Sequence, residues 1–185
     1  MRYLVLLLPF LTLLSCASIS EEQCRTGDWE AIGRQDGKAG RSPDYLGNHA
    51  KACAEIGVTP DQSAWDRGRI QGLRLYCTPE NAYSIGRNGD AVNNVCPASA
   101  VGVLTRANAW GQEYYGITGE IADLHDERDE IRALLATLTG ELSDEQKALR
   151  RTYRERLLRL DGKLFDLERD RRRFGSLPQS LVADL

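Results

Sequence analysis

Cysteine is the residue type with the widest chemistry in this 185-residue chain, which has five of them. Four lie in the body of the sequence, too far apart for the C-x2-C spacing typical of zinc ligands and redox motifs. The four are Cys24, Cys53, Cys77 and Cys96. Cys77 stands beside a predicted helix start, which favours a reactive thiolate. An even number of cysteines in a chain that is exported, as its N-terminus predicts, nevertheless favours disulfides.

Four cysteines can form two disulfides in three ways. We expect Cys77 to pair with Cys96, around the helix that carries Tyr83, and Cys24 to pair with Cys53. The alternative joins Cys53 to Cys77 and Cys24 to Cys96. Each closed loop stabilises the folded chain by a few kcal/mol in the chain-entropy account.

The other residues typical of catalysis or metal binding are few. His49 and His125 have no serine or cysteine at the spacing of a hydrolase motif. The acids of residues 123–130 lack the glycine turn of a calcium loop, and we interpret them as a solvated helix face. The sequence therefore predicts no catalytic residue, no metal site and no cofactor.

A degenerate repeat joins an aromatic residue to a glycine followed by arginine. Its three copies are Trp29 with Arg34, Trp65 with Arg69, and Tyr83 with Arg87, and Trp110-Gly111 resembles a fourth. The planar guanidinium suits carboxylate and phosphate groups, so six converging side chains would bind a cell-wall or other anionic fragment. In the alternative, each arginine pairs with a local acid such as Asp36 or Asp66, and the aromatic residues belong to the core.

The glycines of this repeat are costly inside a helix, each by up to about 1 kcal/mol relative to alanine. Gly33 and Gly37 are four residues apart, as are Gly68 and Gly72. Glycines at this spacing lie on one helix face and allow a neighbouring backbone to approach closely. We therefore expect a compact bundle of short helices with close crossings.

The N-terminus has the layout of a secretory signal peptide, predicted at residues 1–15. Arg2 precedes an apolar stretch at 3–14, and the small Ser15 follows. A helix of that length reaches about 18 Å, too short for a hydrocarbon core of about 30 Å. The stretch therefore predicts export rather than a permanent membrane span.

The residues around Cys16 identify the kind of export signal. Leu13-Leu14-Ser15-Cys16 resembles the lipobox of bacterial lipoproteins, in which the cysteine receives acyl chains and becomes the mature N-terminus. Several acyl chains give lasting attachment to a bilayer. The alternative is a secreted protein whose Cys16 is lost or free. By the same resemblance, Ala17 after the cysteine implies the outer membrane of a Gram-negative bacterium, with the protein facing the periplasm.

Helix signals recur along the whole chain, whereas alternation of β-branched residues is not sustained anywhere. Predicted starts are Ser42-Pro43, Thr59-Pro60, Thr78-Pro79, Pro97 and the capping box at 143–146. Predicted stops are Gly57, Gly89, Gly140 and Gly175. The predicted fold class is all-α.

Heptad patterns predict a long antiparallel helical hairpin, a coiled coil, at residues 110–175. Folding the chain back near Leu142 brings apolar residues opposite one another in five pairs. The pairs are Leu135 and Leu149, Ile131 and Tyr153, Leu124 and Leu160, Ile117 and Leu167, and Trp110 and Phe174. The first helix is mainly acidic and the second mainly basic, which favours pairing within the chain.

The predicted domain organisation follows from these patterns. A lipidated linker at 16–23 leads into a disulfide-stapled helical head at 24–109, which carries the repeats. The hairpin at 110–175 comes next, and residues 176–185 form a flexible tail. We expect the basic residues 171–173 to form ion pairs with acids of the partner helix.

The run Tyr-Cys-Thr-Pro-Glu-Asn at 76–81 is the most distinctive motif in the chain. With the glycine pairs, the segment Gly86-Arg87-x-Gly89 and the charged coiled-coil end, it resembles a bacterial lipoprotein family of unknown function. The resemblance implies export, lipidation and the cysteine set, and it implies no activity or ligand.

Charge excludes one class of partner. The formal net charge of −3 is not the footprint of a nucleic-acid-binding protein. We expect a membrane-anchored, non-enzymatic lipoprotein that serves as an interaction or envelope-structural module, with an envelope protein as a partner of the hairpin. The alternative is a module that binds a cell-wall or anionic fragment through the repeats.

Overall fold

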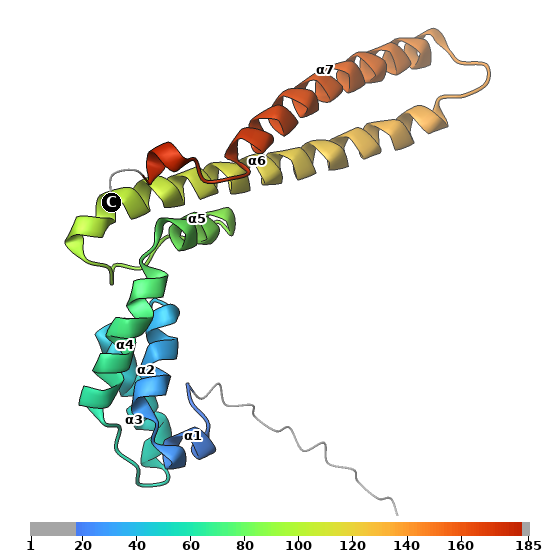
Figure 1. Cartoon of the computed structure of the whole chain (residues 1–185). Coiled ribbons are helices and arrows are strands. Elements are labelled where there is room, and N and C mark those ends of the chain that lie inside the picture. The colour runs from blue at the N-terminus through green and yellow to red at the C-terminus, as the bar shows by residue number, and fades with distance from the viewer. Residues whose placement is uncertain (1–17, 183–185) are drawn as a thin grey trace, which may run out of the picture.

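The computed structural model describes residues 18–182, and these residues form helices and no strand (Figure 1). The predicted signal peptide, Cys16 and Ala17 lie outside the described residues, as do residues 183–185. The α-helices are α1 (Glu21–Thr26), α2 (Trp29–Lys38), α3 (Leu46–Ala54), α4 (Gln62–Tyr76), α5 (Pro79–Arg87), α6 (Ala98–Thr137) and α7 (Asp144–Phe174). Two short 3-10 helices are η1 (Pro43–Tyr45) and η2 (Gln179–Leu181). The predicted all-α fold class is confirmed.

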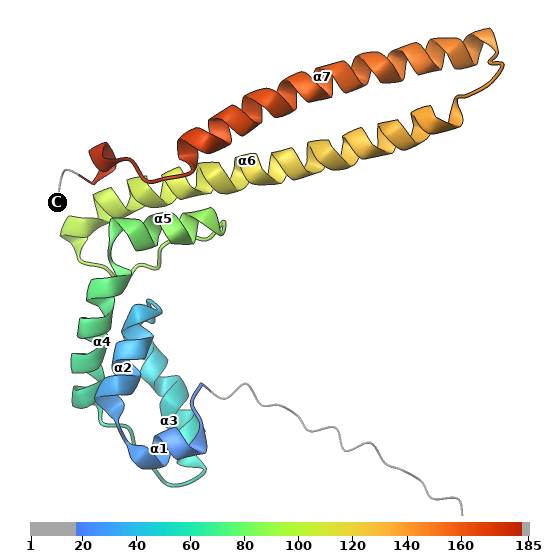
Figure 2. The same ribbon diagram turned by 45° about the vertical axis from the view of Figure 1, so that its right-hand side comes forward.

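The helices are arranged in two groups and an arm (Figures 1 and 2). α1 to α4 form the first group. α5 and the beginning of α6 form the second group, which lies crosswise at the C-terminal end of α4. The rest of α6 pairs with α7 in a long antiparallel hairpin that projects away from the groups, and we call this hairpin the arm.

Two of the five predicted helix starts have the predicted side-chain caps, whereas Ser42 and Pro97 precede their helices without a side-chain cap. Thr78 caps α5, and Ser143 forms the capping box of α7. One prediction is wrong in detail, because α4 is capped by Asp61 rather than Thr59. Asp61 accepts a hydrogen bond from a first-turn amide, and aspartate is as good an N-cap as threonine or better.

Backbone contact between glycines joins α2 to α4. A Cβ atom on Gly33 would overlap the carbonyl group of Trp65, and one on Gly68 would overlap the carbonyl group of Glu30. Gly37 and Gly72 are packed in the same way. The first two copies of the repeat therefore pack against each other, as the glycine spacing predicts.

The other two copies make a second pair of the same kind. A Cβ atom on Gly86 of α5 would overlap the carbonyl group of Asn108, and one on Gly111 of α6 would overlap that of Tyr83. Trp110-Gly111 is thus a working fourth copy. The repeat encodes two glycine-packed helix pairs, α2 with α4 and α5 with α6.

Two disulfides fasten the two groups. Cys24 of α1 is bonded to Cys53 of α3, with their Cα atoms 5.7 Å apart. Cys77 is bonded to Cys96 across the base of α5, with their Cα atoms 5.6 Å apart. This is the preferred pairing from the sequence.

The arm is held by the predicted apolar seam. Leu124, Ile131 and Leu160 are buried in its cluster, and the rings of Trp110 and Phe174 pack with centroids 4.3 Å apart at its base. Charge pairs flank the seam at the same register. Arg156 contacts Glu127 at 2.6 Å, and Lys163 contacts Glu120 at 2.7 Å.

Two features differ from the expected domain organisation. α6 continues without a break through the boundary that we predicted between residues 109 and 110, so it belongs to both the second group and the arm. The segment expected as a loose tail lies back along the second group. The Trp110 indole donates to the Ser176 carbonyl at 2.9 Å, and Leu177 packs on the cluster of α5 and α6.

Candidate functional site

A buried polar network joins the N-terminal segment to α2, α3 and α4. Asp36 Oδ2 accepts hydrogen bonds from Trp65 Nε1 at 2.8 Å and from His49 Nε2 at 2.8 Å. The Ser18 hydroxyl lies 2.9 Å from His49 Nδ1. Because an ionised carboxylate can only accept, His49 Nε2 carries a proton that it donates to Asp36.

The contacts Ser18–His49–Asp36 bring together residue types that serve as nucleophile, base and orienting acid in hydrolases. Their setting favours a structural role instead. His49 is only 2% exposed, and Asp36 is shared with the indole of the fully buried Trp65. A buried histidine of this kind holds elements together because each of its nitrogens has a partner. The network holds Ser18, where the described residues begin, to α2, α3 and α4.

The three repeat arginines have separate partners. Arg34, on the surface of α2, lies 3.8 Å from Glu30 of the same helix. Arg69 is buried, and its Nε donates to the Arg41 carbonyl at 2.7 Å. Arg87 stacks on the ring of Tyr114 at 3.9 Å from its centroid.

Burial shifts the pKa values of two side chains of the repeat. Burial lowers the pKa of Arg69, while the carboxylates of Asp66 and Asp36 act in the opposite direction. Burial raises the pKa of Tyr83, and the guanidinium of Arg87 partly offsets this rise. The Tyr83 hydroxyl donates to the backbone carbonyl of Phe174 at 2.6 Å, so it serves as a clamp between α5 and the end of α7.

The aromatic members of the repeat are divided between two hydrophobic clusters. Trp29 and Trp65 belong to the cluster of the first group, whereas Tyr83 belongs to that of α5 and α6. The six side chains that we proposed as one ligand site thus do not surround a common space. The aromatic residues belong to the core, as the alternative interpretation expects. The arginines follow that interpretation only in part, because Arg34 pairs with an acid whereas Arg69 bonds a backbone carbonyl and Arg87 stacks on a tyrosine.

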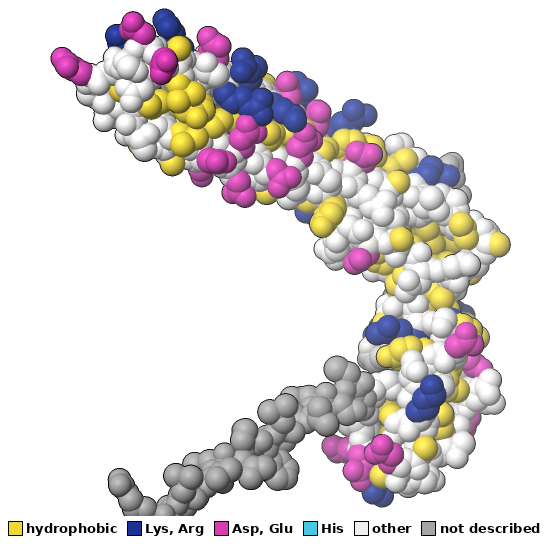
Figure 3. All heavy atoms as spheres, turned by 180° about the vertical axis from the view of Figure 1, so that it is seen from behind, with side chains coloured by type: hydrophobic (Ala, Val, Ile, Leu, Met, Phe, Trp, Pro, Cys, Tyr) yellow, Lys and Arg dark blue, Asp and Glu magenta, His cyan; other side chains and the backbone are white. Residues whose placement is uncertain are grey.

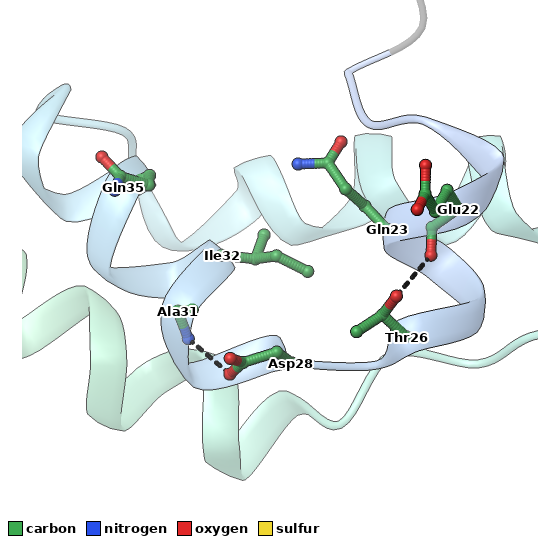
Figure 4. A pocket seen from close by; sticks show the side chains of 7 residues that line it. All are labelled: Glu22, Gln23, Thr26, Asp28, Ala31, Ile32 and Gln35. Carbon is green, nitrogen blue, oxygen red and sulfur yellow. Dashed lines mark hydrogen bonds between the residues drawn. The ribbon is translucent and has the colours of Figure 1, made fainter.

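A shallow pocket of about 280 Å³ lies between α1 and α2 (Figure 4). Several of its polar side chains form hydrogen bonds with the backbone at the ends of α1 and α2. Asp28 caps α2 by accepting from the Ala31 amide at 3.0 Å, and the Thr26 hydroxyl donates to the Glu22 carbonyl at 2.8 Å. Gln23 completes the capping box of α1. These groups shape the loop and leave little to recognise a ligand.

The outer surface of the arm exposes large apolar side chains. Leu158 is 72% exposed and Phe165 is 67% exposed, and they stand one heptad apart on α7. The buried Leu160 and Leu164 mark the opposite side of the helix. Figure 3 shows that Lys and Arg side chains gather along the upper edge of the arm, formed by α7, whereas Asp and Glu predominate below.

Arginines accompany the two exposed apolar residues. Arg151, Arg154 and Arg172 share their side of α7 by helical spacing. None of the three makes a side-chain hydrogen bond or ion pair with another residue in the range 18–182. We call these five residues the arm face.

The remaining candidates from the sequence are the second histidine and the acidic run. His125 and the acids of residues 123–130 lie on α6, where Glu127 pairs with Arg156. Within residues 18–182, no three His, Cys, Asp or Glu side chains are gathered so as to hold a metal ion. No helix in the same range combines the length and the apolar character that a membrane span needs.

These features define an all-helical protein with two disulfides, two glycine-packed helix pairs and a charged hairpin arm. Residues 28–113 match the model of a family described as Protein of unknown function (DUF2799). The matched segment begins at the cap of α2 and ends within α6, so it contains both helix pairs and leaves out most of the arm. The comparisons with curated proteins and with solved structures found no match.

Proposed function

We propose that this protein is an outer-membrane lipoprotein, anchored through acyl chains on Cys16, whose arm face binds an acidic surface of another envelope protein. No catalytic role is included in this proposal. The lipobox-like sequence supports the anchor, and two disulfides agree with an oxidising compartment.

The observation that carries the proposal is the exposure of Leu158 and Phe165 among arginines without acid partners. Aromatic residues and arginine are enriched in protein interfaces, and charged side chains there gain when the partner supplies the opposite charge. Exposed apolar residues grouped on one face indicate an interaction site more strongly than scattered ones. The partner is expected to present an apolar groove rimmed by Asp and Glu.

Photo-crosslinking in cells tests the arm face directly. A photoreactive amino acid at Phe165 is expected to trap a specific protein, whereas the same group at Leu75, which is 59% exposed on α4, is not. The variant Arg151→Glu/Arg154→Glu should abolish the adduct at position 165. Adducts at both positions to the same proteins, or an adduct at 165 that survives the charge reversal, would rule out the arm face as the site.

The anchor has its own test. Cys16→Ala is expected to move the protein from the membrane fraction to the soluble periplasmic fraction, with normal disulfides. Globomycin, which blocks the lipoprotein signal peptidase, should cause the precursor of the wild-type protein to accumulate. Normal maturation and membrane retention of the Cys16→Ala protein would refute lipidation at this residue.

The alternative function, a module for cell-wall or other anionic fragments, has less support. It requires Arg34, Arg69 and Arg87 to act on one ligand, and the three belong to different helices with separate partners. Binding of peptidoglycan fragments that is lost in Arg34→Gln and Arg87→Gln alike would restore this alternative.

A further inference from the structure

A second feature stands apart from the arm face and is independent of the function proposed for it. A cavity of about 600 Å³ lies where the C-terminal end of α4 meets the beginning of α6. α4 contributes Ile70, Leu73 and Arg74 to it, and Val95 from the connection between α5 and α6 lines it as well. We call this cavity the elbow pocket. Its volume is within the range of about 300–1,000 Å³ that is usual for small-molecule sites.

The lining of the elbow pocket is apolar except for one cation. α4 packs against α2 with its glycine face, so Ile70 and Leu73 are on a side of the helix that α2 does not cover. Ile70 is 57% exposed. Cys77 and Cys96 line the pocket as well, and their disulfide fixes the end of α4 to the segment just before α6. An exposed apolar surface in a concave, covalently fixed site indicates a ligand with an apolar body.

Two positive groups lie at this pocket without anionic partners. Arg74 makes no hydrogen bond or ion pair with another described residue. α6 begins at Ala98, after Pro97, with no side-chain cap and no acid in its first turn, in contrast to α5 and α7. The amides of a helix start and its dipole stabilise an anion. Pro97 and Ala100 line the cavity together with Arg74, so a charged group beside Arg74 would lie near the start of α6.

Hydrogen bonds of Asn93 hold the junction beside the elbow pocket together. The side-chain amide of Asn93 donates to the Gly40 carbonyl at 3.0 Å, and its backbone amide donates to the Tyr76 hydroxyl at 2.9 Å. These bonds connect the first group to the segment between α5 and α6. The pocket is thus preformed, which reduces the entropic cost of binding.

From this arrangement we propose that the elbow pocket binds a single long acyl chain with a carboxylate head group, that is, a free fatty acid. The chain lies along Ile70, Leu73 and Val95, and the carboxylate pairs with Arg74 near the first turn of α6. This ligand satisfies the apolar lining and the unpaired guanidinium together. Neither a free phosphate nor a neutral hydrocarbon satisfies both.

The experiment uses the chain from residue 16 onward with Cys16→Ser, so that no acyl group of its own is present, and with both disulfides formed. The probe is cis-parinaric acid, a fatty acid that fluoresces in apolar surroundings, below the concentration at which it forms micelles. Its methyl ester has the same chain without the charge. We expect saturable fluorescence with the acid and binding of the ester that is about tenfold weaker, as the loss of one charge-assisted contact implies.

Variants locate the site. Arg74→Gln should weaken binding of the acid about tenfold and leave that of the ester unchanged, so that the two probes bind alike. Arg67→Gln is the matched control on α4, where Arg67 lies 3.6 Å from Glu30 instead of at the pocket, and it should bind the acid as the wild type does. Ile70→Asp should weaken both probes, while Leu158→Asp on the arm should weaken neither.

Several results would overturn the proposal. Absence of saturable binding by the wild-type protein is one, and equal affinity of the wild type for acid and ester is another. Equal losses in Arg67→Gln and Arg74→Gln would show a general charge effect rather than a site. Circular dichroism of each variant, compared with that of the wild type, separates loss of the pocket from loss of the fold.

Discussion

Gly68 of α4 and Glu30 of α2 face each other so closely that the carbonyl group of Glu30 occupies the space of the Cβ that Gly68 lacks. The relation is reciprocal between the helices, since Gly33 of α2 receives the carbonyl group of Trp65 in the same way. Glycine lowers helix propensity, and here the loss is offset by backbone packing that no other residue permits.

Gly68→Ala should therefore destabilise the protein strongly. The added methyl group meets backbone, which cannot rotate away, and we expect the free energy of unfolding to fall by about 3 kcal/mol or more. Urea unfolding followed by circular dichroism measures this change. Gly162→Ala is the matched control, because a Cβ there meets nothing within 4 Å, and it should stabilise α7 by about 0.5–1 kcal/mol. Equal effects of the two substitutions would contradict the close packing.

Asp36→Ala should remove the common acceptor of the buried network. The indole NH of Trp65 and the imidazole of His49, both buried, would lose their partner, so we expect a loss of about 3 kcal/mol in the free energy of unfolding. Asp44→Ala, at an exposed position in η1, should change stability by less than about 0.5 kcal/mol. A stable Asp36→Ala protein would show that the network contributes little.

Cys24→Ala/Cys53→Ala should lower the free energy of unfolding by about 3–4 kcal/mol, as expected for a disulfide that closes a loop of this length. Maleimide labelling of the denatured, non-reduced wild-type protein, with Cys16 replaced by serine, checks the premise and should find no free thiol. Peptide mapping should find Cys24 linked to Cys53. A fragment that links Cys53 to Cys77 would establish the alternative pairing.

The pKa of Glu127 should report the pairing of the two arm helices. The hydrogen bond from Arg156 lowers this pKa below its ordinary value of 4.5, because the carboxylate form is favoured. A depressed folded-state pKa gives stability above the unfolded value, and that stability is lost as the pH falls through the folded value. Arm stability should thus decline below about pH 4.5.

NMR titration of the Glu127 side-chain carboxyl group measures this pKa. Arg156→Gln is expected to return it toward the ordinary value, and Lys147→Gln, whose lysine pairs with Asp144 of its own helix, should leave it in place. An unshifted pKa in the wild-type protein would mean that the pair is not formed in solution.

The arm and the helix pairs could be predicted from the sequence because their signals are local or periodic. One fold-back point places Trp110 opposite Phe174, and the structure brings their rings together. The glycine spacing likewise predicted close crossings, although not which copies would pair. Neighbourhood in the chain does not decide this, because α4 and α5 are joined by only two residues and yet each packs its glycines against a different helix.

The parts that could not be predicted depend on contacts between distant segments. Ser18 meets His49 only because the N-terminal segment folds over α3, and no motif marks that return. One signal was present, since His49 lies one turn before Cys53 and so shares the buried face that the disulfide creates. Arg87 stacks on Tyr114 because α5 packs on α6, and an acid within its own helix is a poor guide to such a partner.

A last consequence concerns α6, which runs unbroken from the elbow to the far end of the arm. Ala100 of its first turn lines the elbow pocket, and its later turns carry the arm. Because one continuous helix serves both, we expect a displacement of the arm to be transmitted to the wall of that pocket.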